Sequence, residues 1–120
     1  MGALTPEGKV KAKVVKVLKE YGIWYFFPAN NGYGKAGIPD IICCVNGAFL
    51  GIEVKSERGV VSALQAQVGQ EIHRAGGNWI VVRCDDDVVA LRARLRILEN
   101  VGRREGTGAG NEASAPQPGT

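Results

Sequence analysis

The sequence has few of the residues that build sulfur- and nitrogen-ligated metal centres. It contains three cysteines and one histidine, His73, and no two cysteines are separated by two residues. Cys43 and Cys44 are neighbours in an expected strand, so their side chains point to opposite faces and cannot easily hold one ion. The sequence therefore predicts no zinc site, and we interpret the cysteines as buried free thiols in a reducing cytoplasm.

Long apolar segments are also missing. No apolar run approaches the ~20 residues that cross a bilayer, and the N-terminus lacks the apolar region of a signal peptide. We therefore expect a cytoplasmic protein with no membrane partner.

Residues 103–120 contain no large apolar residue and are rich in Gly, Pro, Ser and Ala. Such a segment cannot bury enough surface to offset its ordering entropy, which predicts one domain over residues 1–102 and a disordered tail over 103–120.

The charge is small but unevenly distributed. The net charge is +3, and residues 1–39 hold six lysines against two glutamates. Arg92, Arg94 and Arg96 form a second basic cluster. Phosphate groups are the usual partners of such clusters, but solvated helix faces have the same composition. Charge alone leaves both interpretations open.

Helix and strand signals alternate along the chain. Thr5 followed by Pro6 begins a helix that ends at Gly22, and Ser62 with Gln65 has the pattern of a capping box at a second helix. The other expected elements are strands at about 23–27, 40–45, 48–55 and 78–84, a glycine-rich loop over 29–37 and a last helix over about 85–100. The order α-β-β-β-α-β-α predicts an α/β fold with a mixed four-stranded sheet flanked by helices.

Asn46-Gly47 is the strongest hairpin signal in the chain. A type I′ turn there places Asp40 opposite Glu53, and Lys55 lies on the same face as Glu53. Directly opposed like charges destabilise a sheet unless they are neutralised, and a divalent cation held by oxygen ligands would do so. The alternative is an ordinary cross-strand salt-bridge cluster on a solvated face.

These residues resemble the signature of PD-(D/E)xK nucleases, with Pro39-Asp40, a hairpin, and then Glu53-Val54-Lys55. More narrowly, the segment AGIPDIICCVNGAFLGIEVKSERG followed by Ala63-Leu64-Gln65 is similar to the VRR-NUC domain, the virus-type replication-repair nuclease. The resemblance covers about residues 5–95. It implies a restriction-endonuclease-like core and a metal-dependent deoxyribonuclease.

The chemistry expected of the site follows from phosphodiester hydrolysis. One or two Mg²⁺ ions, for which Mn²⁺ can substitute, activate a water and stabilise charge on the phosphate. Asp40 and Glu53 are the expected ligands, and the resemblance implies the backbone carbonyl of Val54 as a third. Lys55 would orient the attacking water and stabilise the developing charge.

Two further residues are candidates with an alternative each. Helical spacing places Glu7 on the side of the first helix that carries its apolar residues and is expected to face inward. The family carries an acidic residue in this helix. Glu7 could equally be an N-terminal acid that interacts with the helix dipole or with Lys11. The resemblance implies that Gln65 packs beside Lys55 and helps to hold substrate or water, whereas the capping box with Ser62 could account for it fully.

The remaining candidates would contact DNA. Lys35 and Tyr33 in the glycine-rich loop could bind the backbone beside the scissile bond, and Ser56 and Arg58 could line the substrate groove. Lys9, Lys13 and Lys16 could act more distantly or simply be solvated.

The resemblance further implies a small phage-type protein, in the cytoplasm of a bacterial host, that cuts branched DNA. A Holliday junction resolvase needs two symmetric cuts and so predicts a homodimer. The alternatives are a flap or duplex nuclease of replication and repair, and a DNA-binding module without turnover. A sequence-reading restriction enzyme is less expected, because it would need a separate base-reading domain and the chain has 120 residues.

Overall fold

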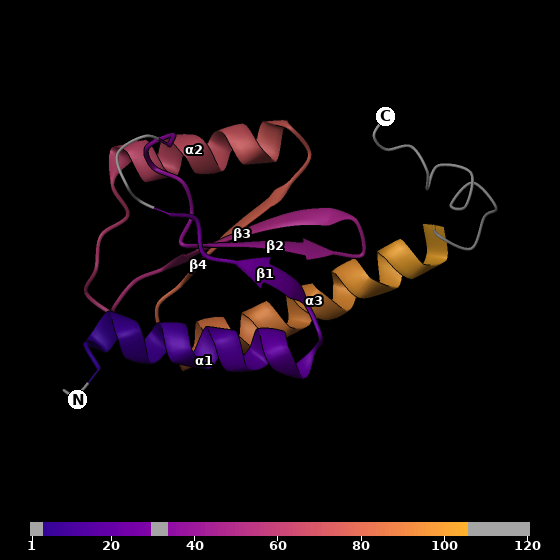
Figure 1. The fold of residues 1–120 in the computed structure, drawn as a ribbon, viewed down its shortest axis with the longest axis horizontal. Helices are drawn as coiled ribbons and strands as arrows, with labels where there is room; N and C mark the ends of the chain where they lie inside the picture. Colours follow the sequence, from indigo (N-terminus) through magenta and orange to yellow (C-terminus); the bar gives the residue numbers. More distant parts are fainter. Residues whose placement is uncertain (1–3, 30–33, 106–120) are drawn as a thin grey trace.

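Four strands form one mixed sheet between two layers of helices (Figure 1). The structure, a computed structural model, describes residues 4–29 and 34–105, and it describes side chains in the last helix as far as Val101. The elements follow the predicted order α-β-β-β-α-β-α. Their bounds are α1 Pro6–Glu20, β1 Trp24–Phe26, β2 Ile41–Val45, β3 Ala48–Val54, α2 Ala63–Arg74, β4 Asn78–Val82 and α3 Asp85–Glu105.

The first two helices begin at the predicted caps. The Thr5 hydroxyl accepts a hydrogen bond from the Gly8 backbone N–H at 3.0 Å, and Pro6 is the first residue of α1. At α2, the Ser62 hydroxyl accepts from the Gln65 N–H at 3.1 Å while Gln65 Oε1 accepts from the Ser62 N–H at 2.9 Å. These bonds satisfy backbone donors that a helix leaves unpaired at its start.

The hairpin register is the predicted one. Asn46 and Gly47 both have positive φ, 53° and 86°, as a type I′ turn requires. The strands β2 and β3 pair antiparallel from Val45 with Ala48 to Ile41 with Ile52. Strand β1 pairs antiparallel with β2, and β4 pairs parallel with β3, so the sheet order is β1-β2-β3-β4.

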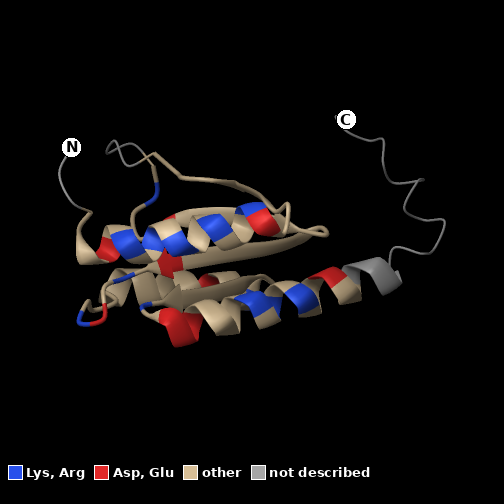
Figure 2. Cartoon of the chain, turned by 90° about the horizontal axis from the view of Figure 1, so that it is seen from below, with Lys and Arg blue, Asp and Glu red and all other residues tan. Residues whose placement is uncertain are grey.

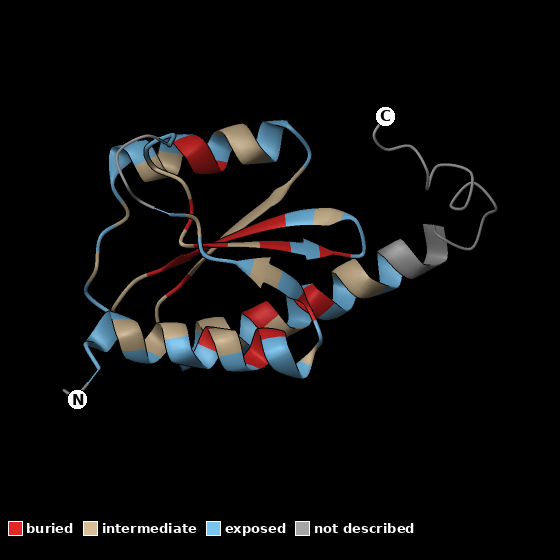
Figure 3. Cartoon of the chain, viewed as in Figure 1, coloured by how far each residue is buried: buried red, intermediate tan, exposed pale blue. Residues whose placement is uncertain are grey.

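The two faces of the sheet are covered differently. Helices α1 and α3 pack on one face and enclose the main core, which includes Leu18, Leu50, Ile52, Leu91 and Leu95 (Figure 3). Helix α2 lies on the opposite face. The residues of β3 that alternate with this core therefore point toward α2, and Glu53 is one of them.

Strands β1 and β4 and helix α3 differ most from their expected bounds, and β4 ends at Val82 instead of at about 84. Strand β1 has three residues instead of five. Helix α3 continues to Glu105, which takes it into the segment that the sequence predicts as a tail. Residues 106–120, the rest of that segment, lie outside the described residues. Within the part of the chain that the structure describes, no helix is long and apolar enough to cross a membrane.

Candidate active site

The hairpin brings Asp40 and Glu53 together, as its register predicts. The ladder ends at Ile41 and Ile52, and Asp40 and Glu53 are the next residues on the two strands. Asp40 lies just before β2, where its Oδ2 accepts a hydrogen bond of 2.8 Å from the Val54 backbone N–H. This bond ties the Asp40 carboxylate to the end of β3.

Glu53 is completely buried, with no exposed surface. Its Oε1 accepts a hydrogen bond from Gln65 Nε2 at 3.2 Å, whereas its buried Oε2 has no hydrogen-bond partner among the described residues. Burial, and next the negative charge of Asp40, raise the pKa of Glu53 to about 7. The Lys55 ammonium acts in the opposite direction and favours the ionised carboxylate. Glu53 is thus a buried carboxyl that lacks a partner for one oxygen.

Trp79 is a neighbour of Glu53 that sequence reasoning did not single out. It lies on β4 opposite Gly51, on the sheet face that carries Glu53. Its buried Nε1 favours the ionised form of Glu53, although the geometry falls short of a hydrogen bond. A Cβ atom built on Gly69 of α2 would lie 2.4 Å from the Trp79 ring, so helix and indole are in close contact. In the sequence, the only indication of this contact was that Gly69 is a glycine within an expected helix.

Lys55 follows β3 directly and is half-buried. Its backbone N–H donates to the Val82 carbonyl at 3.0 Å, so the main chain at this position is held to β4. The charge of the Lys55 ammonium lowers the pKa of Glu53 against the larger effect of burial. The register brings Asp40 and Glu53 together, and Lys55 lies two residues beyond Glu53, with no ion pair to either carboxylate among the described residues.

Gln65 has both of the geometric relations that the sequence allowed. Its Oε1 closes the capping box with Ser62, and its Nε2 donates to Glu53. Since the cap uses the amide oxygen, the amide nitrogen is left to face the carboxyl. The cap therefore orients the side chain toward the site instead of competing with that role.

Glu7 lies at the start of α1, before the part of the helix that packs on the core. The side chain is exposed in the first turn of α1, and it lines a hollow together with Lys11 and Ser56. Val10, three residues further along, is partly buried, and Val14, about two turns from Glu7, is fully buried. The structure does not bring Glu7 into a common ligand group with Asp40 and Glu53.

Of the residues proposed to contact DNA, Lys35 lines the hollow that contains Asp40, and Ser56 lines a second hollow with Lys11. Lys35 is exposed and forms an ion pair with Glu71 at 3.4 Å. Ser56 is half-buried in the hollow that it shares with Lys11, whereas Arg58 is exposed in the turn after β3 and does not line that hollow. Tyr33 lies outside the described residues.

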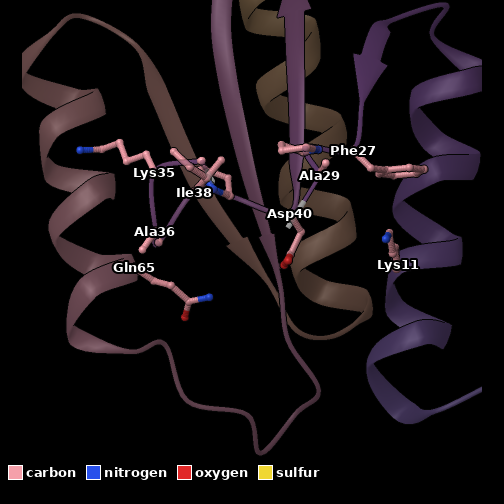
Figure 4. A pocket seen from close by; sticks show the side chains of 12 residues that line it. Lys11, Phe27, Ala29, Lys35, Ala36, Ile38, Asp40 and Gln65 are labelled. Carbon is pink, nitrogen blue, oxygen red and sulfur yellow. The ribbon is translucent and has the colours of Figure 1, made fainter. Parts of the chain in front are cut away.

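A hollow of about 360 Å³ opens beside Asp40. Figure 4 shows Asp40 between two walls, with Gln65 and Lys35 on the α2 side and Lys11 and Phe27 on the α1 side. Sequence reasoning did not single out Lys11 or Phe27. Helical spacing puts Lys11 on a different side of α1 from Lys9, and that difference was the available signal.

Two carboxylates and an unpartnered buried oxygen fit a hard divalent cation. Mg²⁺ binds few protein carboxylates and keeps several waters, so it does not need a cage of protein ligands. Within residues 4–29 and 34–105 no group of three or more His, Cys, Asp or Glu side chains could hold a metal ion. A cation here would therefore depend on Asp40 and Glu53, and the predicted third ligand is the Val54 carbonyl.

The cysteines carry no part of this site. Cys43 is buried, and burial, with a smaller effect of Cys44, raises the pKa of its thiol to about 12. Cys44 is exposed on the opposite face, so the expected opposition of the two side chains is confirmed while Cys44 is not buried.

No protein-family model matches the sequence, and no curated protein matches it significantly. The similarity to VRR-NUC nucleases rests on the quoted residues, and membership of that family stays a prediction.

Proposed function

We propose that the protein is a divalent-metal-dependent deoxyribonuclease of the PD-(D/E)xK class and VRR-NUC type, which cuts branched DNA as an endonuclease. The observation that carries the proposal is the pair Asp40 and Glu53 at the ends of β2 and β3, with Glu53 Oε2 buried and unpartnered. A salt-bridge cluster would pair Lys55 with one of the two carboxylates, and the described residues hold no such ion pair. Lys55 beside the pair supplies the positive charge that phosphoryl chemistry uses.

Each residue has a role in the proposed reaction. Asp40, Glu53 and the Val54 carbonyl would hold Mg²⁺ or Mn²⁺, which when bound activates water and neutralises charge on the phosphate. Lys55 orients the attacking water and stabilises the negative charge that develops on the phosphate oxygens. Gln65 keeps the Glu53 carboxyl in place through its 3.2 Å hydrogen bond.

DNA is the proposed partner because unpaired lysines lie along α1, the helix that carries Lys11 at the hollow beside Asp40. Lysines follow α1 on several of its sides (Figure 2), and the chain has a net charge of +3. Lys13 is paired with Asp85 at 2.7 Å, but the described residues hold no ion-pair partner for Lys9, Lys11 or Lys16. Unpaired lysines at the surface are available for phosphate contacts.

Cleavage of a labelled substrate panel tests the proposal. Single strand, duplex, 5′ flap and four-way junction are incubated with Mg²⁺, Mn²⁺ or EDTA, with Asp40→Asn, Lys55→Ala and the control Gln67→Ala, which changes an exposed side chain of α2. We expect metal-dependent cutting that falls by about 100-fold or more in the first two variants and persists in Gln67→Ala. Binding without cutting in every condition, unchanged in the variants, would instead leave a DNA-binding module.

The same panel decides between branched substrates. A resolvase acts as a two-fold homodimer, so two protomers should bind each four-way junction in sedimentation experiments and both strands should be cut symmetrically. One protomer on each junction, with a cut in a single strand, would favour the flap or duplex nuclease.

A further inference from the structure

Lys11 and Phe27 form a pair at the wall of the hollow beside Asp40. The Lys11 ammonium nitrogen lies 4.2 Å from the centroid of the Phe27 ring. The described residues give Lys11 no carboxylate partner, and Phe27 is 47% exposed directly after β1. A half-exposed aromatic ring and an unpaired cation thus lie next to the proposed scissile position (Figure 4).

Lys11 also connects two hollows. It lines both the hollow of about 360 Å³ that contains Asp40 and a hollow of about 430 Å³ that contains Glu7 and Ser56. A polynucleotide strand that passes Asp40 would leave the first hollow past Lys11 and enter the second. The position of Lys11 between them suits a phosphate group of that strand.

We propose that Lys11 and Phe27 form a subsite for one unpaired nucleotide beside the phosphate that is cleaved. This inference rests on the proposed nuclease function and specifies its substrate, a strand whose bases are unpaired at the cut. The base stacks on Phe27, and Lys11 binds the adjoining phosphate.

The size of the hollow and the chemistry of its wall support this substrate. A volume of about 360 Å³ is at the lower end of small-ligand pockets, which suits a single nucleotide. Stacking on an aromatic side chain accepts any base, because every base has a π-face. An exposed cation–π contact stabilises by only about 0.5–1 kcal/mol, so Lys11 can leave the ring when a nucleotide arrives.

The first experiment compares two neighbouring phenylalanines of similar exposure. Phe27 and Phe26 are 47% and 44% exposed, and Phe26 does not line the hollow. The wild type, Phe27→Leu, Phe27→Trp and Phe26→Leu are assayed on a duplex with two unpaired nucleotides and on the same duplex fully paired. We expect Phe27→Leu to lower the ratio of the two cleavage rates about tenfold. Phe27→Trp and Phe26→Leu should keep the ratio, and an unchanged ratio in Phe27→Leu would overturn the proposal.

The second experiment needs no cleavage and so separates this proposal from the proposed function. A single-stranded oligonucleotide with 2-aminopurine is bound in EDTA, and stacking is followed by the quenching of its fluorescence. Quenching should occur with wild type and weaken in Phe27→Leu but not in Phe26→Leu.

Lys11→Ala should weaken binding and reduce the salt dependence of binding by about one phosphate contact. Both effects should be larger than those of Lys16→Ala. Equal quenching in both leucine variants would refute the subsite even if the protein cuts DNA, and a wild type that stacks but never cuts would refute only the nuclease.

Discussion

The buried carboxyl of Glu53 should make the metal-free protein less stable at neutral pH than in mild acid. Glu53→Gln tests this, because the amide has the same size and its oxygen can still accept the hydrogen bond from Gln65 Nε2. The variant removes the charge and keeps the packing. We expect it to be more stable than the wild type above neutral pH, although it loses a proposed metal ligand.

The direction follows from the two protonation states. The pKa of Glu53 is about 7 in the folded protein against 4.5 for the unperturbed group. Below pH 4.5 the carboxyl is protonated in both states and imposes no electrostatic penalty. As the pH rises through 7 the folded state must ionise a buried group, and the stability that the raised pKa provided is lost. The difference between the two pKa values corresponds to about 3 kcal/mol when the loss is complete.

Urea unfolding in EDTA at pH 5 and pH 8 measures the effect. The free energy of unfolding of Glu53→Gln should be close to that of the wild type at pH 5 and about 3 kcal/mol higher at pH 8, which corresponds to about 10–20 °C in Tm. Added Mn²⁺ should stabilise the wild type at pH 8 and leave the variant unchanged. The same difference between the two proteins at both pH values would refute the assignment of a raised pKa to Glu53.

Three other changes test the surroundings of the site. Gly69→Ala should destabilise the fold by about 1–3 kcal/mol in urea unfolding, because its Cβ would lie 2.4 Å from the Trp79 ring and the ring must move. Gln65→Ala should cost about 1–3 kcal/mol of unfolding free energy, since the capping box loses one of its two bonds and buried Glu53 loses its hydrogen bond from Gln65. In the native protein a thiol reagent should modify exposed Cys44 at once, whereas buried Cys43, whose pKa is about 12, should react only on unfolding.

Each of these changes has a control. Gly34→Ala should be neutral, because a Cβ there meets nothing within 4 Å. Gln67→Ala removes only an exposed side-chain bond of 3.4 Å to Glu71 and should cost less than Gln65→Ala. If the two glutamine variants are equally stable, the cap at Ser62 does not hold α2. A prompt reaction of Cys43 in the native protein would show that β2 is not packed as described.

The elements and the register could be predicted because their causes are local. Thr5 and Ser62 act within their own helices, and the positive φ values of Asn46 and Gly47 follow from the residue types. The adjacency of Asp40 to Glu53 then follows from counting along the ladder. None of these steps needs a contact between distant parts of the chain.

The burial of Glu53 could not be predicted because its cause is long-range. The exposed fraction falls to zero only when α2 lies over β3 and β4, and no local pattern gives the position of that helix. Glu7 shows a second limit of local patterns. Its direction on the helix follows from spacing, but spacing does not say that the side chain is exposed at the start of α1. An apolar stripe gives the direction of a side chain around the helix axis, but it does not show where along the helix the core ends.

Two glycines allow the close packing that buries Glu53. A Cβ on Gly51 would lie 2.8 Å from the Pro39 ring, and one on Gly37, where φ is +81°, would lie 2.9 Å from Leu64 of α2. Both glycines let the loop before β2 approach the sheet and the helix closely. This close packing buries the carboxyl and raises its pKa.

Close packing around Glu53 therefore both weakens the metal-free fold and prepares the site for a cation. A proton and a divalent cation compete for the same carboxyl, so binding near pH 6 should release close to one proton and binding at pH 9 almost none. Titration calorimetry with Mn²⁺ in buffers of different ionisation enthalpy counts that proton directly. Asp40→Asn should reduce the release as well as the affinity, because the Asp40 charge is the second cause of the raised pKa. Binding with no proton release at pH 6 would mean that the cation does not bind through Glu53, and the proposed site would be wrong.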